Sequence, residues 1–397
     1  MEEKKRIAYI AIISFGLVSL FGDIIYEGAR GAISPYFEFL GATAFIFGVI
    51  ISIGDFLGYT LRLISGYIAD IKKTYWIFIL LGYGLLIAIP LLAFVRYLPI
   101  IGPAWLLAGI LVIIERIAKA LRSPARDTLL SITTRGVGVG KAFGLHELMD
   151  QIGAIAGPAL VALVLFLTGN DFFYAFLILF IPYILLLVVL SQAYIRLRTY
   201  TNLAFKSIQE EKKELGKAEL PREFNLYTLA VFMNTAGLIH ILLILYVASR
   251  YLGMQAWLIA VLYIIVQGID AIIAPFSGYM YDKFGRKVLG IPFILAILPT
   301  FFVLLKTASA IFLASIFFGI ILGMQESIYR AAVADIVPLE RRGTGYGIFN
   351  TIYGIGFLVS GSLFGFFIDY NLLNIAVIYT TFMQIIALIF LISSLEK

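Results

Sequence analysis

The feature that most limits how this chain can fold is a succession of apolar runs, each long enough to cross a lipid bilayer. A helix needs about 20 apolar residues to span the hydrocarbon core. With 61% hydrophobic and 14% charged residues, the chain is far more apolar than a soluble domain. We predict an all-α membrane protein with twelve transmembrane helices, at residues 7–38, 43–70, 74–96, 103–131, 139–168, 172–195, 225–250, 255–281, 288–306, 308–335, 344–369 and 372–394.

The lysines and arginines predict how these helices are oriented, because such residues concentrate in cytoplasmic loops. If the N-terminus is cytoplasmic, the loops on the opposite side hold only Arg96, Arg250 and Lys306. We therefore expect a multi-pass protein of the plasma membrane with both termini in the cytoplasm. The net charge of +6 then reflects topology rather than a nucleic-acid partner. The basic N-terminus leads into an apolar run too long for a cleavable signal peptide, so the first helix is expected to remain.

The chain divides into two six-helix halves that repeat each other. The one long polar segment, residues 196–224, follows the sixth predicted helix and is interpreted as a cytoplasmic linker between bundles at 1–195 and 225–397. Gly66-Tyr-Ile-Ala-Asp70 after the second helix returns as Gly278-Tyr-Met-Tyr-Asp282 after the eighth. Such duplication is typical of secondary transporters.

The repeated loops resemble the major facilitator superfamily, and the resemblance extends over essentially the whole chain. The run from Gly278 to Lys287 is similar to that family's signature loop. The first-half copy departs from the signature at Ile71, Lys73 and Thr74. The resemblance implies two pseudo-symmetric six-helix bundles around a central cavity, which rock to expose the cavity to each side of the membrane in turn.

The fifth predicted helix carries a second, narrower resemblance, to the proton-coupled antiporters of that family. Its glycines and proline follow the spacing of their helix-five motif, although Val161 and Ala162 replace the usual closing pair of glycines. Glycine lets helices pack closely, and glycine followed by proline permits a kink. The charged run 122–150 is similar to a large and mostly uncharacterised prokaryotic branch. The motif residues are Gly144, Gly153, Gly157 and Pro158.

Acids at the cytoplasmic ends of the second and eighth helices are candidates for a gate. Such an acid can cap a helix N-terminus and pair with an arginine until the link breaks. By the resemblance, Asp70 would meet the region 342–344, whereas a static brace of the loop is the alternative. For Arg122 and Arg126, the positive-inside rule explains their position as well as a gating role does. The gate candidates are Asp70, Asp282, Arg286, Arg126, Arg330 and Arg342.

Acids near mid-membrane depth are candidates for proton carriers. Asp23, Glu27 and Arg30 are spaced i, i+4 and i+7, so they share one helix face, which cannot point at lipid. Burial favours the neutral form of a carboxylate, so Asp23 or Glu27 is the first choice of carrier. A structural cluster that neutralises itself is the alternative. His146 and Asp150 lie one turn apart and are expected to form a structural pair, with a proton relay as the alternative. The coupling candidates are Asp23, Glu27, Asp55, Glu115 and Asp150.

Polar and aromatic side chains within the spans are candidates for the lining of a substrate cavity. Charges are concentrated in the first half, so coupling is expected there. The second half is expected to supply shape and apolar contacts. The cavity candidates are Tyr26, Arg30, Arg62, Arg116, Asn234, Gln267 and Gln325.

These observations favour a secondary transporter that exports a small amphipathic organic solute in exchange for protons. Uptake or exchange of a small organic anion, bound by Arg30, Arg62 and Arg116, is one alternative, and a non-transporting membrane receptor is another. The chain has no cysteine, two histidines and no Walker-type phosphate loop, so no metal, cofactor, ATP drive or enzyme activity is expected. The expected partners are a small-molecule substrate, protons and the bilayer, with the monomer as the functional unit.

Overall fold

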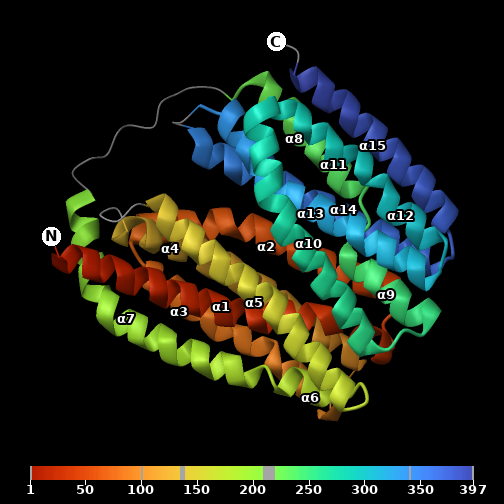
Figure 1. The fold of residues 1–397 in the computed structure, drawn as a ribbon, viewed down its shortest axis with the longest axis horizontal. Helices are drawn as coiled ribbons and strands as arrows, with labels where there is room; N and C mark the ends of the chain where they lie inside the picture. Colours follow the sequence, from red (N-terminus) through yellow and green to blue (C-terminus); the bar gives the residue numbers. More distant parts are fainter. Residues whose placement is uncertain (1, 100–101, 135–138, 209–219, 339–340, 396–397) are drawn as a thin grey trace. The chain divides into compact units, whose positions relative to one another are not determined.

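The structure is a computed structural model that describes residues 2–99, 102–134, 139–208, 220–338 and 341–395. Every regular element in those ranges is helical, so the all-α prediction is confirmed (Figure 1). The elements before the linker are α1 (Glu2–Phe39), α2 (Ala44–Lys72), α3 (Tyr75–Gly84), the 3-10 helices η1 (Leu85–Ala88) and η2 (Pro90–Tyr97), α4 (Ala104–Thr133), α5 (Val139–Leu167), α6 (Phe172–Leu177) and α7 (Phe180–Ile208).

The elements after the linker are also helical. They are α8 (Arg222–Ala236), α9 (Ile241–Leu252), α10 (Ala256–Phe284), the 3-10 helix η4 (Gly285–Leu289), α11 (Gly290–Leu295), α12 (Ile297–Leu304), α13 (Ala308–Ile336), α14 (Arg342–Asp369) and α15 (Leu373–Leu395).

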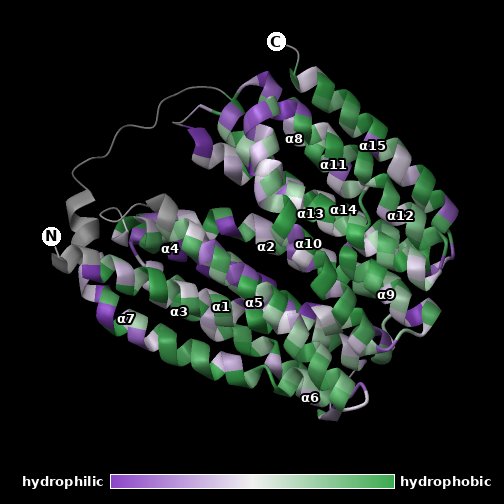
Figure 2. Cartoon of the chain, in the orientation of Figure 1, coloured by the Kyte–Doolittle hydropathy of each residue, from purple (hydrophilic) through white to green (hydrophobic). Residues whose placement is uncertain are grey.

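Most of these helices are apolar enough to lie in a membrane. Within the described residues, ten segments have the length and hydropathy of membrane spans, and one of them, Ala256–Leu304, contains α10 to α12. Helix α4 is not among the ten, since Glu115, Arg116 and Lys119 lie near its middle. The arrangement is consistent with the predicted twelve spans. Figure 2 shows hydrophobic residues along most of the length of the helices, whereas hydrophilic residues gather at helix ends and on a few interior stretches.

Four of the predicted spans, 74–96, 172–195, 225–250 and 288–306, are divided between helices, and two of these interruptions have a clear local cause. Pro90 has no N–H to donate, so α3 passes into the 3-10 segments η1 and η2 instead of continuing. The seventh span is broken after Gly237, and its second part begins with His240 as N-cap. The His240 Nδ1 accepts a 3.1 Å hydrogen bond from the backbone N–H of Leu242, which satisfies one of the free donors of α9.

The chain forms two compact units. The first unit is Met1–Arg30 with Thr60–Glu214, and the second unit is Gly31–Tyr59 with Leu215–Lys397. The division runs through α1 and α2, because the segment Gly31–Tyr59 packs with residues from the C-terminal half. The bundles at 1–195 and 225–397 stay a prediction.

Glycines bring α1 and α5 together in the first unit. A Cβ at Gly157 would lie 2.5 Å from the carbonyl oxygen of Ile24 and 2.9 Å from the backbone nitrogen of Gly28. A Cβ at Gly153 would lie 2.6 Å from the carbonyl oxygen of Leu20, whereas Gly144 has open space around it. Two of the three glycines in the helix-five motif are therefore required by close packing.

Glycines serve the same purpose in the second unit. A Cβ at Gly361 of α14 would lie 2.6 Å from the carbonyl oxygen of Gly48 on α2. A Cβ at Gly323 of α13 would lie 2.9 Å from the carbonyl oxygen of Asp270 on α10. Backbones this close leave no room for side chains, which fixes the depth and rotation of each helix against its neighbour.

Replacement of Gly157 should separate the effect of the contact between α1 and α5 from general effects on α5. We expect Gly157→Val to lower stability by about 1–3 kcal/mol, because the added carbons meet backbone atoms of α1 that cannot move aside cheaply. Gly144→Ala is the matched control and should leave the thermal midpoint of the purified protein in detergent equal or slightly raised. Equal effects of the two substitutions would contradict this packing.

Candidate functional site

Three cations surround the ring of Tyr26 in the first unit. Lys119 Nζ donates a 2.8 Å hydrogen bond to the Tyr26 hydroxyl and lies 4.2 Å from the centre of the ring. The guanidinium carbons of Arg122 and Arg30 lie 5.5 and 5.7 Å from the same ring centre. Tyr26 itself is buried. The electron-rich face of an aromatic ring attracts cations, and this attraction orients them without neutralising their charge.

Helical spacing explains how α1 and α4 build this cluster. Tyr26 and Arg30 are separated by four residues on α1, and Lys119 and Arg122 by three residues on α4, so each pair lies on one helix face. Gly82 of α3 holds α4 at this level, since a Cβ there would lie 2.7 Å from the carbonyl oxygen of Ala118 and 2.6 Å from Cβ of Arg122. Lys119 and Arg122 were not predicted to belong to the site, although their spacing of three residues on α4 is visible in the sequence.

The predicted coupling acids of α1 lie in the same cluster. Glu27 Oε1 is 3.2 Å from Arg30 Nη1. Asp23 is buried and lies close enough to Tyr26 and Lys119 to interact with both. The structure therefore brings Asp23 and Glu27 to the cations of the Tyr26 cluster, and their role in coupling stays a prediction.

The remaining charged candidates of the first unit lie around this cluster. Glu115 Oε2 is 3.6 Å from Arg116 Nη1, and both residues are buried. Arg62 lies near enough to interact electrostatically with Lys119. The cavity candidates Arg62 and Arg116 are thus neighbours of the Tyr26 cluster rather than contacts of the Tyr26 ring.

Arg126 joins α1, α4 and α5 one turn further along α4. Its Nη1 donates a 2.6 Å hydrogen bond to Ser19 and lies 3.9 Å from Asp150 Oδ2, while its Nη2 lies 2.9 Å from Asp127. His146 Nε2 is 3.8 Å from Asp150 Oδ2 and 3.5 Å from Ser19 Oγ. The expected contact of His146 with Asp150 is present, and it belongs to a network that also holds Arg126.

Asp55 is paired with a histidine in the second unit. Its Oδ2 lies 3.2 Å from His240 Nε2 at the start of α9. Because His240 Nδ1 accepts from the Leu242 N–H, the proton of the neutral ring belongs on Nε2, which then donates to Asp55. The break in the seventh span is what brings His240 to this position, and no sequence pattern indicated the pair.

Five polar side chains of the second unit form one hydrogen-bonded network. Asn234 donates to Gln384 Oε1 at 2.8 Å and accepts from Gln325 at 3.3 Å and from Tyr329 at 2.7 Å. Tyr353 donates to Gln325 Oε1 at 3.0 Å. The cavity candidates Asn234 and Gln325 are therefore brought together, with Gln384 as a partner that sequence analysis missed.

Two other sets of candidates do not join these clusters. Gln267 of α10 is buried, and its Oε1 has no hydrogen-bond partner in the described part of the chain.

Among the gate candidates, Asp70 accepts a 2.7 Å hydrogen bond from Tyr75, and Asp282 and Arg330 are exposed. Arg286 lies 3.2 Å from Glu223, and Arg342 Nε donates to the carbonyl of Val337 at 3.4 Å. Their gating role stays a prediction.

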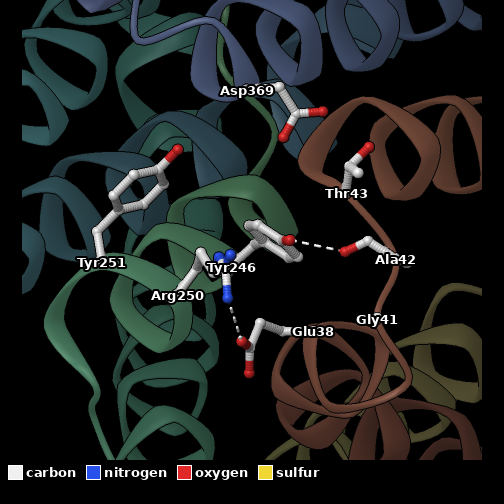
Figure 3. Close-up of a pocket in the computed structure, with 8 residues that line it drawn as sticks. All are labelled: Glu38, Gly41, Ala42, Thr43, Tyr246, Arg250, Tyr251 and Asp369. Atoms are coloured by element: carbon white, nitrogen blue, oxygen red, sulfur yellow. Dashed lines mark hydrogen bonds and ion pairs between the residues drawn. The ribbon is translucent and has the colours of Figure 1, made fainter.

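A pocket of about 210 Å³ lies where the α1–α2 loop meets α9 and α14 in the second unit (Figure 3). The Asp369 carboxylate at the end of α14 accepts two 2.8 Å hydrogen bonds from the first backbone N–H groups of α2, at Ala44 and Phe45. Tyr246 donates to the carbonyl of Ala42 at 2.7 Å, and Arg250 lies 3.3 Å from Glu38. The polar side chains that line the pocket are thus bonded to backbone groups or to one another, and these bonds hold the helices together.

Comparison with known proteins identifies the family. The sequence profile of the Major Facilitator Superfamily matches residues 13–361, and the chain belongs to that family. It is therefore a multi-pass membrane protein and a secondary transporter rather than an enzyme. An uncharacterized protein of Mycobacterium tuberculosis strain H37Rv is 34% identical over 377 residues, which cover 94% of this chain and 90% of that protein. An uncharacterized MFS-type transporter of Methanocaldococcus jannaschii is 25% identical over 364 residues, covering 88% and 86%.

Solved transporters share the fold. The nucleoside transporter NupG, solved as a mutant, has a TM-score of 0.71 and 14% identity, and the match covers 97% of this chain and 100% of that chain. A D-xylose-proton symporter has a TM-score of 0.66 and 17% identity, with 94% and 97% covered. At these identities the likeness concerns the fold alone.

The network around Asn234 gives a test of the second unit. Asn234→Ala removes three side-chain hydrogen bonds and leaves buried partners without a bond, and each such bond in a membrane protein contributes about 0.6 kcal/mol on average. We expect a loss of about 2 kcal/mol, seen as a lower thermal midpoint in detergent. Asn350→Ala, at a residue whose Oδ1 has no hydrogen-bond partner among the described residues, is the control and should change little.

Proposed function

We propose that this transporter carries a small organic anion and couples its movement to protons. The observation that supports the anion is the Tyr26 cluster, in which acids lie nearby but two of the three cations form no salt bridge with a described residue. Arg30 is ion-paired with Glu27, whereas Lys119 and Arg122 have no carboxylate at salt-bridge distance in the described part of the chain. A cation held away from water is costly unless it is paired, so the buried Arg122 beside the partly buried Lys119 favours a solute that brings its own negative charge.

The same cluster suggests how protons would take part. When Asp23 or Glu27 takes up a proton, the net positive charge around Tyr26 rises, and the attraction for an anion rises with it. By linkage, a bound anion favours protonation of the acid to the same degree. Proton and anion would therefore bind together, which favours symport of both in one direction, with the cavity opening to each side of the membrane in turn.

Export of an amphipathic solute by proton antiport is the second candidate. The observation that favours it is the contact of the helix-five glycines with α1. A Cβ at Gly153 would lie 2.8 Å from Cβ of Asp23, so the antiporter-like motif packs directly against a coupling acid. This contact would let a change in the charge of Asp23 act on the position of α5.

The proposal includes the orientation of the chain, with both termini in the cytoplasm of a plasma-membrane protein. The chain has no cysteine, so a single introduced cysteine reports its own exposure. We expect a membrane-impermeant maleimide to label Ser309→Cys, at the exposed start of α13, in intact cells. Lys287→Cys should be labelled only after permeabilisation. The reverse pattern would overturn the orientation.

The transport test uses liposomes with an imposed pH gradient and a pH-sensitive dye inside. We expect succinate or another small carboxylate to evoke proton movement, and tetraphenylphosphonium to evoke none. Asp23→Asn, which resembles the permanently protonated acid, should abolish movement driven by the pH gradient while anion exchange at equal pH persists. Glu147→Gln, at an exposed acid of α5, is the control and should behave as the unsubstituted protein.

The two candidates predict different results in this assay. Proton movement evoked by the lipophilic cation and not by carboxylates would favour antiport of amphipathic solutes. Proton movement evoked by neither class of solute would contradict proton coupling altogether. If proton coupling were unchanged in Asp23→Asn, the proton carrier would be another acid, and Glu27 would be the next residue to test.

A further inference from the structure

Arg122 is a buried cation that forms no ion pair or hydrogen bond with a described residue, although the buried carboxylate of Glu115 on the same helix is near enough to interact with it electrostatically. Its side chain lies between two tyrosine rings, with Cζ 5.5 Å from the centre of Tyr26 and 5.1 Å from that of Tyr83. The residue is 3% exposed, and its Nη1 has no hydrogen-bond partner. No ion pair or hydrogen bond of Arg122 is formed with any described residue. Two aromatic faces attract the guanidinium but cannot accept its N–H groups in the guanidinium plane.

The lack of polar contacts at Arg122 is not a general property of arginines on α4, as Arg126 shows. It lies four residues further along the same helix and contacts Ser19, Asp127 and Asp150. Burial of a charge without a partner is destabilising, and side chains kept at such a cost are found at functional sites. Arg122 is therefore unexplained by the stability of the fold and by the positive-inside rule, since it is buried within the first unit.

Two further hydrogen-bond donors near Arg122 also have no anionic acceptor among the described residues. The hydroxyl of Tyr83 is buried and has no hydrogen-bond partner within the described residues. Lys119 precedes Arg122 by one helical turn, and its one hydrogen bond to a described side chain goes to the neutral oxygen of Tyr26. Helices α3 and α4 thus present an ammonium, a guanidinium and a hydroxyl without a negative charge among the three.

We propose that Arg122, with Lys119, binds the oxyanion group of the transported solute, a carboxylate or a phosphate. This inference rests on the proposed function and names the residue that determines its specificity. An oxyanion is a stronger acceptor for Lys119 than a phenol oxygen is, so it displaces the Tyr26 hydroxyl from Nζ. Because the Tyr26 ring contacts both cations, its displacement opens the guanidinium to the anion. The planar fork of Arg122 then holds two oxygens at once.

The test compares variants of the purified protein in detergent by thermal unfolding, with and without added anion. Without anion, Arg122→Met should raise the thermal midpoint, because it replaces an unpaired buried charge with an apolar chain of similar size. Arg126→Met is the matched control and should lower the midpoint, because it breaks an existing network. A lower midpoint for Arg122→Met would show a structural role and overturn the inference.

The second measurement is the rise in midpoint on addition of a probe. The probes are succinate and inorganic phosphate, with phosphatidylglycerol to distinguish a lipid headgroup from a free solute. Succinate or phosphate should stabilise the unsubstituted protein and not Arg122→Met. Arg122→Lys keeps the charge but loses the fork, so its half-saturating concentration should be about tenfold higher. Equal stabilisation of Arg122→Met and the unsubstituted protein would overturn the inference, as would stabilisation by phosphatidylglycerol alone.

Failure of this site and failure of the proposed function give different results. Anion stabilisation that depends on Arg122, without proton movement in liposomes, would support the site and contradict proton coupling. Proton-coupled carboxylate uptake that is unchanged in Arg122→Met would leave the proposed function in place and overturn the role of Arg122.

Discussion

Charged and polar groups inside a membrane protein must find their partners within the protein, because hydrocarbon offers none. The second unit meets this requirement. Asn234 and Gln384 bond to each other and are fully buried, and Asp55 is paired with His240. The first unit meets it only in part, since Arg122 is as buried as these residues and has two rings for neighbours. That difference separates the closed hydrogen-bonded network of the second unit from the site that we propose for the solute.

Close helix packing is what makes such buried clusters possible. The backbones of α1 and α5 touch at Gly28 and Gly157, and α3 touches α4 at Gly82. Each contact sets the rotation of a helix, and the rotation determines which side chains point into the unit. The cluster around Tyr26 therefore depends on small residues that carry no charge and no functional group of their own.

The second unit contains its own connection between the α1–α2 hairpin and the C-terminal helices. Asp369 caps the N-terminus of α2 with both carboxylate oxygens. Tyr246 donates a hydrogen bond to the carbonyl of Ala42 (Figure 3). A carboxylate at a helix N-terminus satisfies free N–H groups and the positive end of the helix dipole together. These bonds explain why Gly31–Tyr59 belongs to the second unit although it precedes the linker in the chain.

The sequence by itself determined the class of protein, most of the helices and the family, because hydropathy and glycine motifs are local signals. It also placed Asp23, Glu27 and Arg30 on one face, since helical spacing is set within a few residues. It could not show that Lys119 bonds to Tyr26, that His240 reaches Asp55, or that Gln384 meets Asn234. Those pairs join residues far apart in the chain, and they depend on the depth and rotation of packed helices. Only the tertiary structure decided that Arg122 is buried between two rings, because the positive-inside rule explains an arginine in the second half of α4 equally well until its neighbours are known.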